Sequence, residues 1–157
     1  TVQRVFQNLL RERVPIRDAV SILEALGEAG PSSRNPVLLT EFVRQAIRRG
    51  IVKPWLNANG ELPAWFIDPQ IERFVEGAVE HAEANSTLAI PPQSMRDLLD
   101  RITRAVGPIE SPVAVITSSG CRYFMRQMVE SAMPNLFFLS HGEIPAGIRV
   151  ISLGVVQ

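Results

Sequence analysis

Hydrophobic side chains in the first third of the chain recur at the three- and four-residue spacing of amphipathic helices. One apolar stripe covers residues 2–10 and ends near a Val-Pro pair, because proline disfavours a helical residue before it. A second stripe, which includes Val20 and Leu23, covers residues 16–26 and stops at glycines followed by a proline. A third begins at Asn35-Pro36, with the asparagine as N-cap, and continues to about residue 50. This region therefore predicts a small unit of three short helices.

The pattern changes after the turn sequence Asn57-Ala58-Asn59-Gly60, where we place a boundary between two units. Beyond this turn, short apolar runs alternate with amphipathic helical stripes. The runs predict strands at residues 62–67, 87–90, 112–117, 136–139 and 148–155. The stripes predict helices at residues 69–82, 95–106 and 119–132.

The segment from 112 to 139 gives the clearest signal in the chain. Both of its strands are continuously apolar, which is typical of strands covered on both faces, and an amphipathic helix joins them. We expect a β-α-β unit with parallel strands and a right-handed crossover. The predicted fold class is therefore α+β or α/β. A small three-helix subdomain covers residues 1–58, and a small α/β subdomain with a short, partly parallel sheet covers residues 59–157.

Composition excludes several classes of protein. The chain has 157 residues, 46% hydrophobic and 20% charged, which is typical of a folded globular protein rather than a disordered one. A single cysteine leaves no disulfide framework and no cysteine-rich zinc site. No apolar run is long enough to span a bilayer, and no signal-peptide pattern opens the chain. Because the first residue is Thr1, we expect a fragment of a longer protein.

Charge divides the chain at the same boundary. The 16 basic and 16 acidic side chains balance, which argues against the strongly basic profile of a dedicated nucleic-acid binder. Residues 1–58, however, contain nine Arg or Lys and five Asp or Glu. Residues 59–157 contain seven Arg or Lys and eleven Asp or Glu. The two parts thus carry +4 and −4. This asymmetry suggests two units with different surfaces, or copies that meet head to tail.

The turn after the strand at 112–117 carries the first candidate chemistry. Ser118, Ser119 and Cys121 stand where a helix N-terminus would favour an anion or a thiolate, and His141 follows the next strand. One alternative is therefore an anion-binding domain or a small α/β enzyme centred on these residues. Ser119 as an N-cap and Cys121 as a small buried hydrophobe explain the same pattern, and we favour them. No metal-ligand spacing or cofactor motif is present, so we predict no metal and no cofactor.

A basic edge lies near the end of the third predicted helix. Arg44, Arg48 and Arg49 stand there, and Lys53 comes soon after. Three helices with a basic third helix resemble a helix-turn-helix reader, so a DNA-binding module is a second alternative. No Asn or Gln cluster accompanies the arginines for base readout. A solvated face and a protein-protein contact are the favoured interpretations.

Three stretches of the chain resemble one protein family. Residues 8–18, NLLRERVPIRD, are similar to the signature of the large export-gate protein of type III secretion systems. Residues 39–47 resemble the following helix of that family, and residues 133–145 resemble its closing α/β segment. The resemblance extends over nearly the whole chain. Residues 87–102 look more like the injectisome branch than the flagellar branch, so we favour the injectisome branch.

The resemblance implies a function that periodicity alone does not. Family members have an N-terminal membrane part and four cytosolic subdomains, and this chain looks like the last two. That implies a non-catalytic domain at the cytoplasmic face of the bacterial inner membrane, joined to the membrane only through a missing N-terminal part. Copies are expected to form a nine-membered ring. The other implied partners are chaperone-substrate complexes, the gatekeeper protein, and further export-apparatus and ATPase-complex proteins, without nucleic acid.

Site residues follow from the same resemblance. A role in ring contacts, or in fixing the helical unit, is assigned to Arg13, Arg17, Asp18, Arg44 and Arg48. For Arg17 and Asp18, local capping and pairing is an equally good interpretation. A role in partner docking is assigned to Ser140, His141 and Glu143, which we expect at an exposed, polar loop tip.

Overall fold

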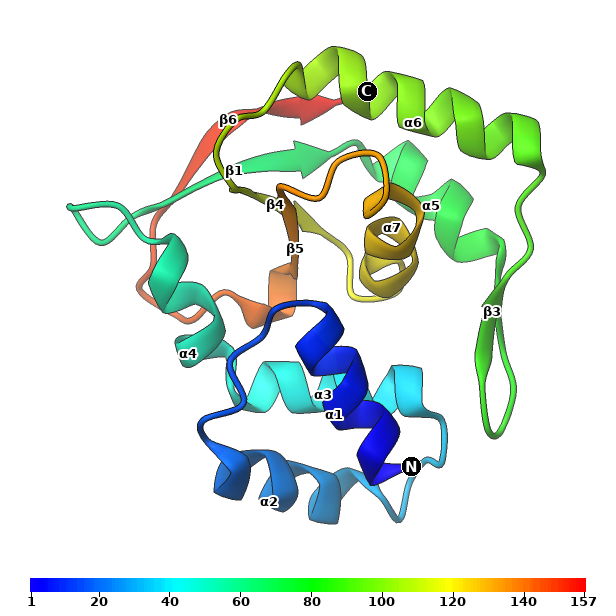
Figure 1. Ribbon diagram of the computed structural model, residues 1–157, viewed down its shortest axis with the longest axis vertical. Coiled ribbons are helices and arrows are strands. Elements are labelled where there is room, and N and C mark those ends of the chain that lie inside the picture. The colour runs from blue at the N-terminus through cyan, green and yellow to red at the C-terminus, as the bar shows by residue number, and fades with distance from the viewer.

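The computed structural model describes all residues from Thr1 to Gln157 (Figure 1). Its first part is helical, as the apolar spacing predicts. The helices are α1 (Val2–Arg11), α2 (Ala19–Ala29), α3 (Pro36–Ala46) and α4 (Arg48–Val52), followed by a 3-10 turn at Lys53–Trp55. The third predicted helix therefore divides at Ile47 into α3 and the short α4.

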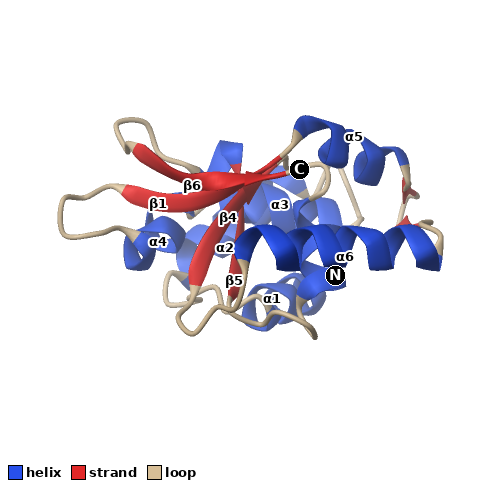
Figure 2. Cartoon of the chain, turned by 90° about the horizontal axis from the view of Figure 1, so that it is seen from above, coloured by secondary structure: helices blue, strands red, loops and turns tan.

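A four-stranded sheet forms the centre of the second part. Its strands are β1 (Leu62–Ile67), β4 (Val113–Thr117), β5 (Leu136–Ser140) and β6 (Val150–Val156), in the order β5-β4-β1-β6. Every neighbouring pair in this sheet is parallel, and Figure 2 shows the strands side by side with the usual twist. The predicted turn at residues 57–60 precedes β1, and Gly60 adopts a positive φ of 73° there.

The remaining elements complete the α/β part. They are the helices α5 (Pro69–Gly77), α6 (Pro92–Val106) and α7 (Arg122–Val129) and the antiparallel hairpin of β2 (Val79–His81) and β3 (Ser86–Leu88). Because α7 joins the parallel strands β4 and β5, the predicted β-α-β unit is confirmed. No helix in the chain combines the length and the apolar character that crossing a bilayer requires.

The hairpin corrects two of the predicted elements. The helix expected at residues 69–82 ends at Gly77, and the strand expected at residues 87–90 lies in the hairpin rather than in the main sheet. Tertiary contacts override the helical spacing here. The buried Asn35 side chain donates one hydrogen bond to the Ala82 carbonyl at 3.1 Å and another to the Ser86 hydroxyl at 2.7 Å. These bonds stabilise an extended backbone where the sequence pattern favours a helix.

The sheet separates two hydrophobic cores. Helices α1 to α4 lie on one side of it, and α5, α6 and α7 pack on the other (Figure 1). Along β4, Ala114 and Ile116 belong to the first core and Val115 to the second, which is the alternation of a strand covered on both faces. Leu9 of α1 packs in the same core as Ile116. The two units therefore share a core, although the element types change near residue 58.

The buried face of α2 differs from the predicted stripe. The helix begins only after Asp18, whose carboxylate accepts a hydrogen bond from the Ser21 amide at 3.1 Å and caps the helix. Its buried residues are Ile22, Ala25, Leu26 and Ala29. Val20 and Leu23 are instead 67% and 52% exposed, so the prediction is wrong for these two. The side of α2 that packs on α3 is rotated away from the stripe counted from residue 16.

Candidate functional site

Five charged side chains form a buried cluster where the helical unit meets the α/β unit. They are Glu12, Glu41, Arg44, Arg122 and Glu143. Arg44, Arg122 and Glu143 have no exposed surface, Glu12 is 4% exposed, and Glu41 lies at the rim with 12% of its side chain exposed. We call these five residues the charge cluster. It connects α1 and α3 with α7 and with the turn that follows β5.

Arg44 on α3 binds two of the three carboxylates. Its Nε donates to Oε2 of Glu143 at 2.7 Å and its Nη2 donates to Oε1 of the same side chain at 3.0 Å, which is a bidentate pair. Its Nη1 lies 3.2 Å from Oε2 of Glu12. Nη2 also donates to the Phe138 carbonyl of β5 at 3.0 Å. Arg44 therefore ties the middle of the helical unit directly to the edge strand of the sheet.

Arg122 at the start of α7 completes the cluster. Its Nη1 and Nη2 donate to the two oxygens of Glu12 at 2.9 and 3.1 Å, and its Nε donates to Oε1 of Glu41 at 2.9 Å. Burial acts to lower the pKa of Arg122, but the carboxylates of Glu41 and Glu12 outweigh burial and raise the pKa above its ordinary range. The guanidinium therefore stays charged inside the protein.

Two of the three carboxylates, Glu12 and Glu41, respond differently to burial. Burial acts to raise the pKa of Glu12, but Arg122 and Arg44 overcome this effect and hold the pKa below its ordinary value. Burial also raises the pKa of Glu41, and there the attraction of Arg122 does not compensate. The cluster thus holds three carboxylates against two guanidiniums, with Glu41 as the carboxylate least favoured in its charged form.

Local backbone geometry brings Glu12 inward. It is the C-cap residue of α1, and Arg13 after it has a positive φ of 60°, the left-handed conformation that often follows a helix end. The Val14 amide then donates to the Leu9 carbonyl at 2.9 Å. This compact turn directs the glutamate into the protein while the Arg13 side chain stays exposed.

Glu143 reaches the cluster from the 3-10 turn His141–Glu143. The Ser140 amide donates to Oε1 of Glu143 at 3.2 Å, which fixes the carboxylate at the end of β5. The expectation that Ser140 and Glu143 lie at an exposed tip is wrong, because both residues are fully buried. Only His141 of the three is exposed, and its Nε2 lies 3.9 Å from Oε2 of Glu72.

The residues assigned to ring contacts separate into two groups. Arg44 was given two possible roles, a ring contact or fixing the helical unit. Because its side chain is buried, its position favours the second role. Arg13, Arg17 and Asp18 are exposed and Arg48 is half-exposed. Asp18 caps α2, and the hydrogen bonds from Ser21 lower its pKa.

The turn after β4 does not form the anion site or the nucleophile considered from the sequence. Oε2 of Glu72 accepts hydrogen bonds from the Thr117 hydroxyl at 2.9 Å and the Ser118 amide at 2.5 Å. The Ser118 hydroxyl donates a hydrogen bond to Oε1 of Glu76. Two carboxylates therefore occupy the place that an anion would take. Burial, reinforced by these two glutamates, raises the pKa of Cys121, which disfavours a thiolate.

Two details of this turn refine the capping prediction. Cys121, not Ser119, is the N-cap residue of α7, and no side chain caps that helix. Cys121 is fully buried, as the interpretation of a small hydrophobe predicts.

The geometry also disfavours the DNA-binding alternative. α3 would be the recognition helix, yet Leu39, Val43 and Arg44 on it are buried against the rest of the protein. Arg48 and Arg49 belong instead to the five-residue α4. The only arginine of α3, Arg44, is buried, so α3 has no basic face that could enter the major groove of DNA.

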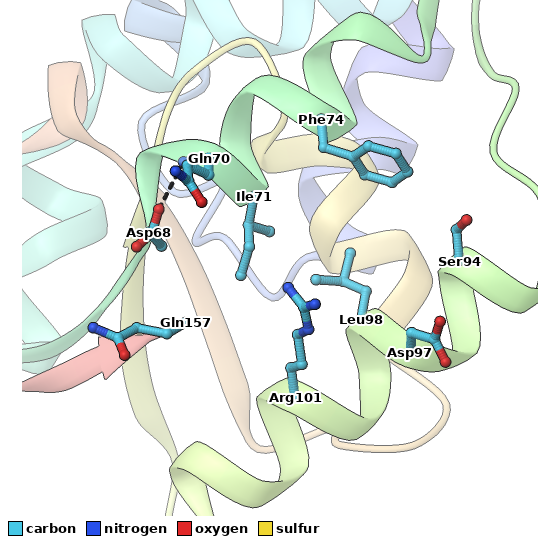
Figure 3. Close-up of a pocket in the computed structure, with 9 residues that line it drawn as sticks. All are labelled: Asp68, Gln70, Ile71, Phe74, Ser94, Asp97, Leu98, Arg101 and Gln157. Carbon is cyan, nitrogen blue, oxygen red and sulfur yellow. Dashed lines mark hydrogen bonds between the residues drawn. The ribbon is translucent and has the colours of Figure 1, made fainter.

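A cavity of about 490 Å³ between α5 and α6 is a second candidate site that the sequence did not reveal (Figure 3). Leu98 and Arg101 extend from α6 toward Ile71 of α5, and Phe74, which is 49% exposed, lies beside them. An apolar floor with a charged rim is typical of a surface that receives a partner side chain.

Comparison with known proteins assigns the family. Residues 1–149 match the FHIPEP family, so the chain belongs to this family of type III export-gate proteins. It is 31% identical over 153 residues to Protein hrpC2 of Xanthomonas euvesicatoria, covering 97% of this chain and 24% of the relative. It is 35% identical over 162 residues to the flagellar biosynthesis protein FlhA of Caulobacter vibrioides, covering 99% of this chain and 23% of the relative. The chain thus spans about a quarter of the length of these relatives.

Solved structures share the fold over almost the entire chain. The Chlamydia pneumoniae CdsV protein superposes with a TM-score of 0.90 at 30% identity, covering 98% of this chain and 45% of that one. Nonameric SctV-C of EPEC gives a TM-score of 0.87 at 27% identity, covering 97% of this chain and 46% of that one. CdsV in its complex with CdsO superposes with a TM-score of 0.88 at 29% identity, covering 98% of this chain and 46% of that one. In sequence, the flagellar relative from Caulobacter vibrioides is as similar to this chain as Protein hrpC2 is, so the preference for the injectisome branch stays a prediction.

Proposed function

We propose that the chain is part of the cytosolic ring of a type III protein-export gate, where copies assemble and receive chaperone-substrate or gatekeeper complexes. The observation that carries this proposal is the likeness, over 97% of the chain, to a subunit of nonameric SctV-C. A backbone that agrees at a TM-score of 0.87 gives this chain the same shape as part of a subunit that closes a ring of nine.

The location and the other partners are proposals of the same kind, because the chain covers only about a quarter of its relatives. We place the parent protein in the bacterial inner membrane and this part at the cytoplasmic face. The solved complex of the similar CdsV protein with CdsO supports the proposal that this protein also binds a further protein. Gatekeeper, export-apparatus and ATPase-complex proteins are partners that the family resemblance implies.

We also propose that the domain is not an enzyme. The sequence offered one nucleophile candidate, Cys121, and its surroundings argue against that role. The thiol is buried, and Glu72 and Glu76 add to the burial in raising its pKa. A cysteine in such surroundings behaves as a structural side chain.

The surfaces available for the two proposed tasks lie on different elements. The ring contact would use Arg13, Arg17 and Arg48, which reach the surface near the ends of α1, α2 and α3. Partner docking would use His141, with Glu143 holding its turn in place from inside.

Sedimentation of the complete cytosolic region of the parent protein tests the ring proposal. We expect concentration-dependent assembly, and we expect Arg17→Glu combined with Arg48→Glu to weaken it by about tenfold at low salt. Arg104→Glu, on the exposed side of α6, serves as the matched control and should assemble normally. A protein that stays monomeric at high concentration and low salt would contradict the proposal.

Titration with a purified chaperone-substrate complex tests the docking surface. His141→Ala should weaken binding severalfold, while Arg104→Glu should not. Equal affinity of the His141→Ala variant and the unmodified protein would remove His141 from the docking surface without affecting the ring.

A further inference from the structure

A basic concavity lies at one end of the molecule. It has a volume of about 890 Å³ and is formed by the start of α2, the end of α3, α4 and the following 3-10 turn. Its cationic side chains are Arg17, Arg48, Arg49 and Lys53. We call this the basic groove.

The chain neutralises only part of the charge of the basic groove. Its one acid, Asp18, caps α2 and stands against four basic side chains. Between residues 45 and 60 the sequence contains three cations, Arg48, Arg49 and Lys53, and no acid. Arg48 donates to the Gln45 carbonyl at 2.9 Å, but neither it nor Arg49 nor Lys53 forms an ion pair. The groove therefore presents an excess of positive charge to solvent.

The β2–β3 hairpin has the opposite character. Glu80 and Glu83 are exposed on it and form no ion pair, and no Lys or Arg occurs between Arg73 and Arg96. The hairpin is also held firmly in place. Asn35 donates hydrogen bonds to Ala82 and Ser86, as described above. A rigid, acidic projection loses little conformational entropy when it enters a complementary groove.

The two features lie at opposite ends of the molecule. In Figure 1 the α4 end lies at the left and the hairpin at the right, and Figure 2, turned about the horizontal axis, keeps this separation. One hairpin therefore does not reach the groove of its own chain. A contact between two different patches of identical subunits is heterologous, and contacts of this kind generate a closed ring when the rotation between neighbours closes, and an open filament when it does not.

We propose that the acidic hairpin of one copy, through Glu80 and Glu83, docks in the basic groove of the neighbouring copy. This inference rests on the ring assembly of the proposed function and adds the two surfaces that meet. Each exposed ion pair contributes little affinity. The contact therefore fixes the register and direction of neighbouring copies and makes assembly sensitive to salt.

A charge exchange in the complete cytosolic region tests the pairing. Reversing the hairpin (Glu80→Arg with Glu83→Arg) or the groove (Arg49→Glu with Lys53→Glu) should each weaken assembly by about tenfold at low salt. Combining both pairs of substitutions should restore assembly, because the charges are then complementary again. The control is Asp100→Arg, on the exposed side of α6, which should have no effect.

Cross-linking gives an independent readout. With Cys121 buried, cysteines placed at positions 49 and 83 by Arg49→Cys and Glu83→Cys should join neighbouring copies through a short bismaleimide. The control variant combines Arg49→Cys with Asp100→Cys, and its copies should not be cross-linked.

The outcomes separate this inference from the proposed function. Assembly that survives hairpin reversal, or a combined variant no better than the groove reversal alone, overturns the hairpin-groove contact and leaves the ring intact. A wild-type protein that never assembles overturns both.

Discussion

The guanidinium of Arg44 and the carboxylate of Glu143 form a fully buried bidentate pair, with Nε–Oε2 and Nη2–Oε1 distances of 2.7 and 3.0 Å. The two residues are 99 positions apart in the sequence. One belongs to the helical unit and the other to the turn after the edge strand β5. This pair, with the shared hydrophobic core, connects the two units directly.

Removing one partner of this pair should be costly. Arg44→Ala removes both guanidinium hydrogen bonds from the buried Glu143 and leaves it only Arg122, whose Nε lies 4.0 Å from Oε2, so we expect a loss of about 3–5 kcal/mol in the free energy of unfolding. That is a large part of the ~5–15 kcal/mol that a typical domain has. Urea unfolding followed by circular dichroism measures the change.

Arg104→Ala is the control for this measurement, because it removes an exposed arginine from α6 and should change stability by less than about 0.5 kcal/mol. Equal effects of the two substitutions would show that the buried pair does not stabilise the fold.

Two glutamates of the charge cluster should respond to pH in opposite directions. Glu12 has a lowered pKa in the folded state, so it stabilises the protein above its ordinary value of 4.5, and this stability is lost as the pH falls through the lowered pKa. Glu41 has a raised pKa, so the folded protein holds its proton more firmly than the unfolded chain does. Its contribution to stability therefore declines as the pH rises above 4.5.

Glutamine variants separate these two contributions. At pH ~7, Glu12→Gln should lower the free energy of unfolding by about 3 kcal/mol, because it removes a carboxylate bound by both arginines. Glu41→Gln should have a smaller effect of the opposite sign. Both differences should shrink in acid, where the carboxylates are protonated in either state. Unfolding curves at several pH values check this, and a destabilising Glu41→Gln at neutral pH would contradict the assignment.

Cys121 should be unreactive in the native protein. Its thiol is buried and its pKa is raised by burial and by the neighbouring glutamates, so labelling by iodoacetamide should be at least tenfold slower in native than in urea-unfolded protein. Mass spectrometry after timed labelling measures the ratio. Comparable rates in both states would revive the nucleophile interpretation.

The elements of the fold were largely predictable from the sequence because they depend on local spacing. The alternating membership of Ala114, Val115 and Ile116 in two cores is what a continuously apolar strand predicts. The hairpin was not predictable, since its strands depend on hydrogen bonds from Asn35, more than 40 residues away. Local periodicity contains no information about such a contact.

The charge cluster was predictable only in part. Arg44 was singled out for ring contacts or for fixing the helical unit, and its burial agrees with the second role. Glu143 was singled out too, but at an exposed loop tip. Arg122 carried a signal that was overlooked, because it stands three and seven positions before the buried Met125 and Val129 and so lies on the apolar stripe of α7. A charged residue on such a stripe needs a buried partner of opposite charge. The partner itself comes from another part of the chain, and the sequence does not say which.

Asn35 should control the order of the β2–β3 hairpin separately from the start of α3. Its Oδ1 accepts from the Val37 amide at 3.0 Å and caps the helix, while its Nδ2 donates to Ala82 and Ser86. Asn35→Asp keeps the capping oxygen and loses both donors, whereas Asn35→Ala loses all three bonds. We expect Asn35→Ala to cost about 2 kcal/mol or more, since it removes a cap and leaves buried groups unpaired.

Hydrogen exchange distinguishes the two variants. In Asn35→Asp, amide protection should fall by tenfold or more in residues 79–88 while α3 stays protected. In Asn35→Ala, protection should fall in both. If the aspartate variant keeps full protection in the hairpin, the side-chain donors of Asn35 do not hold it, and the rigidity on which the hairpin-groove contact depends must come from the backbone pairing of Val79 and His81 with β3.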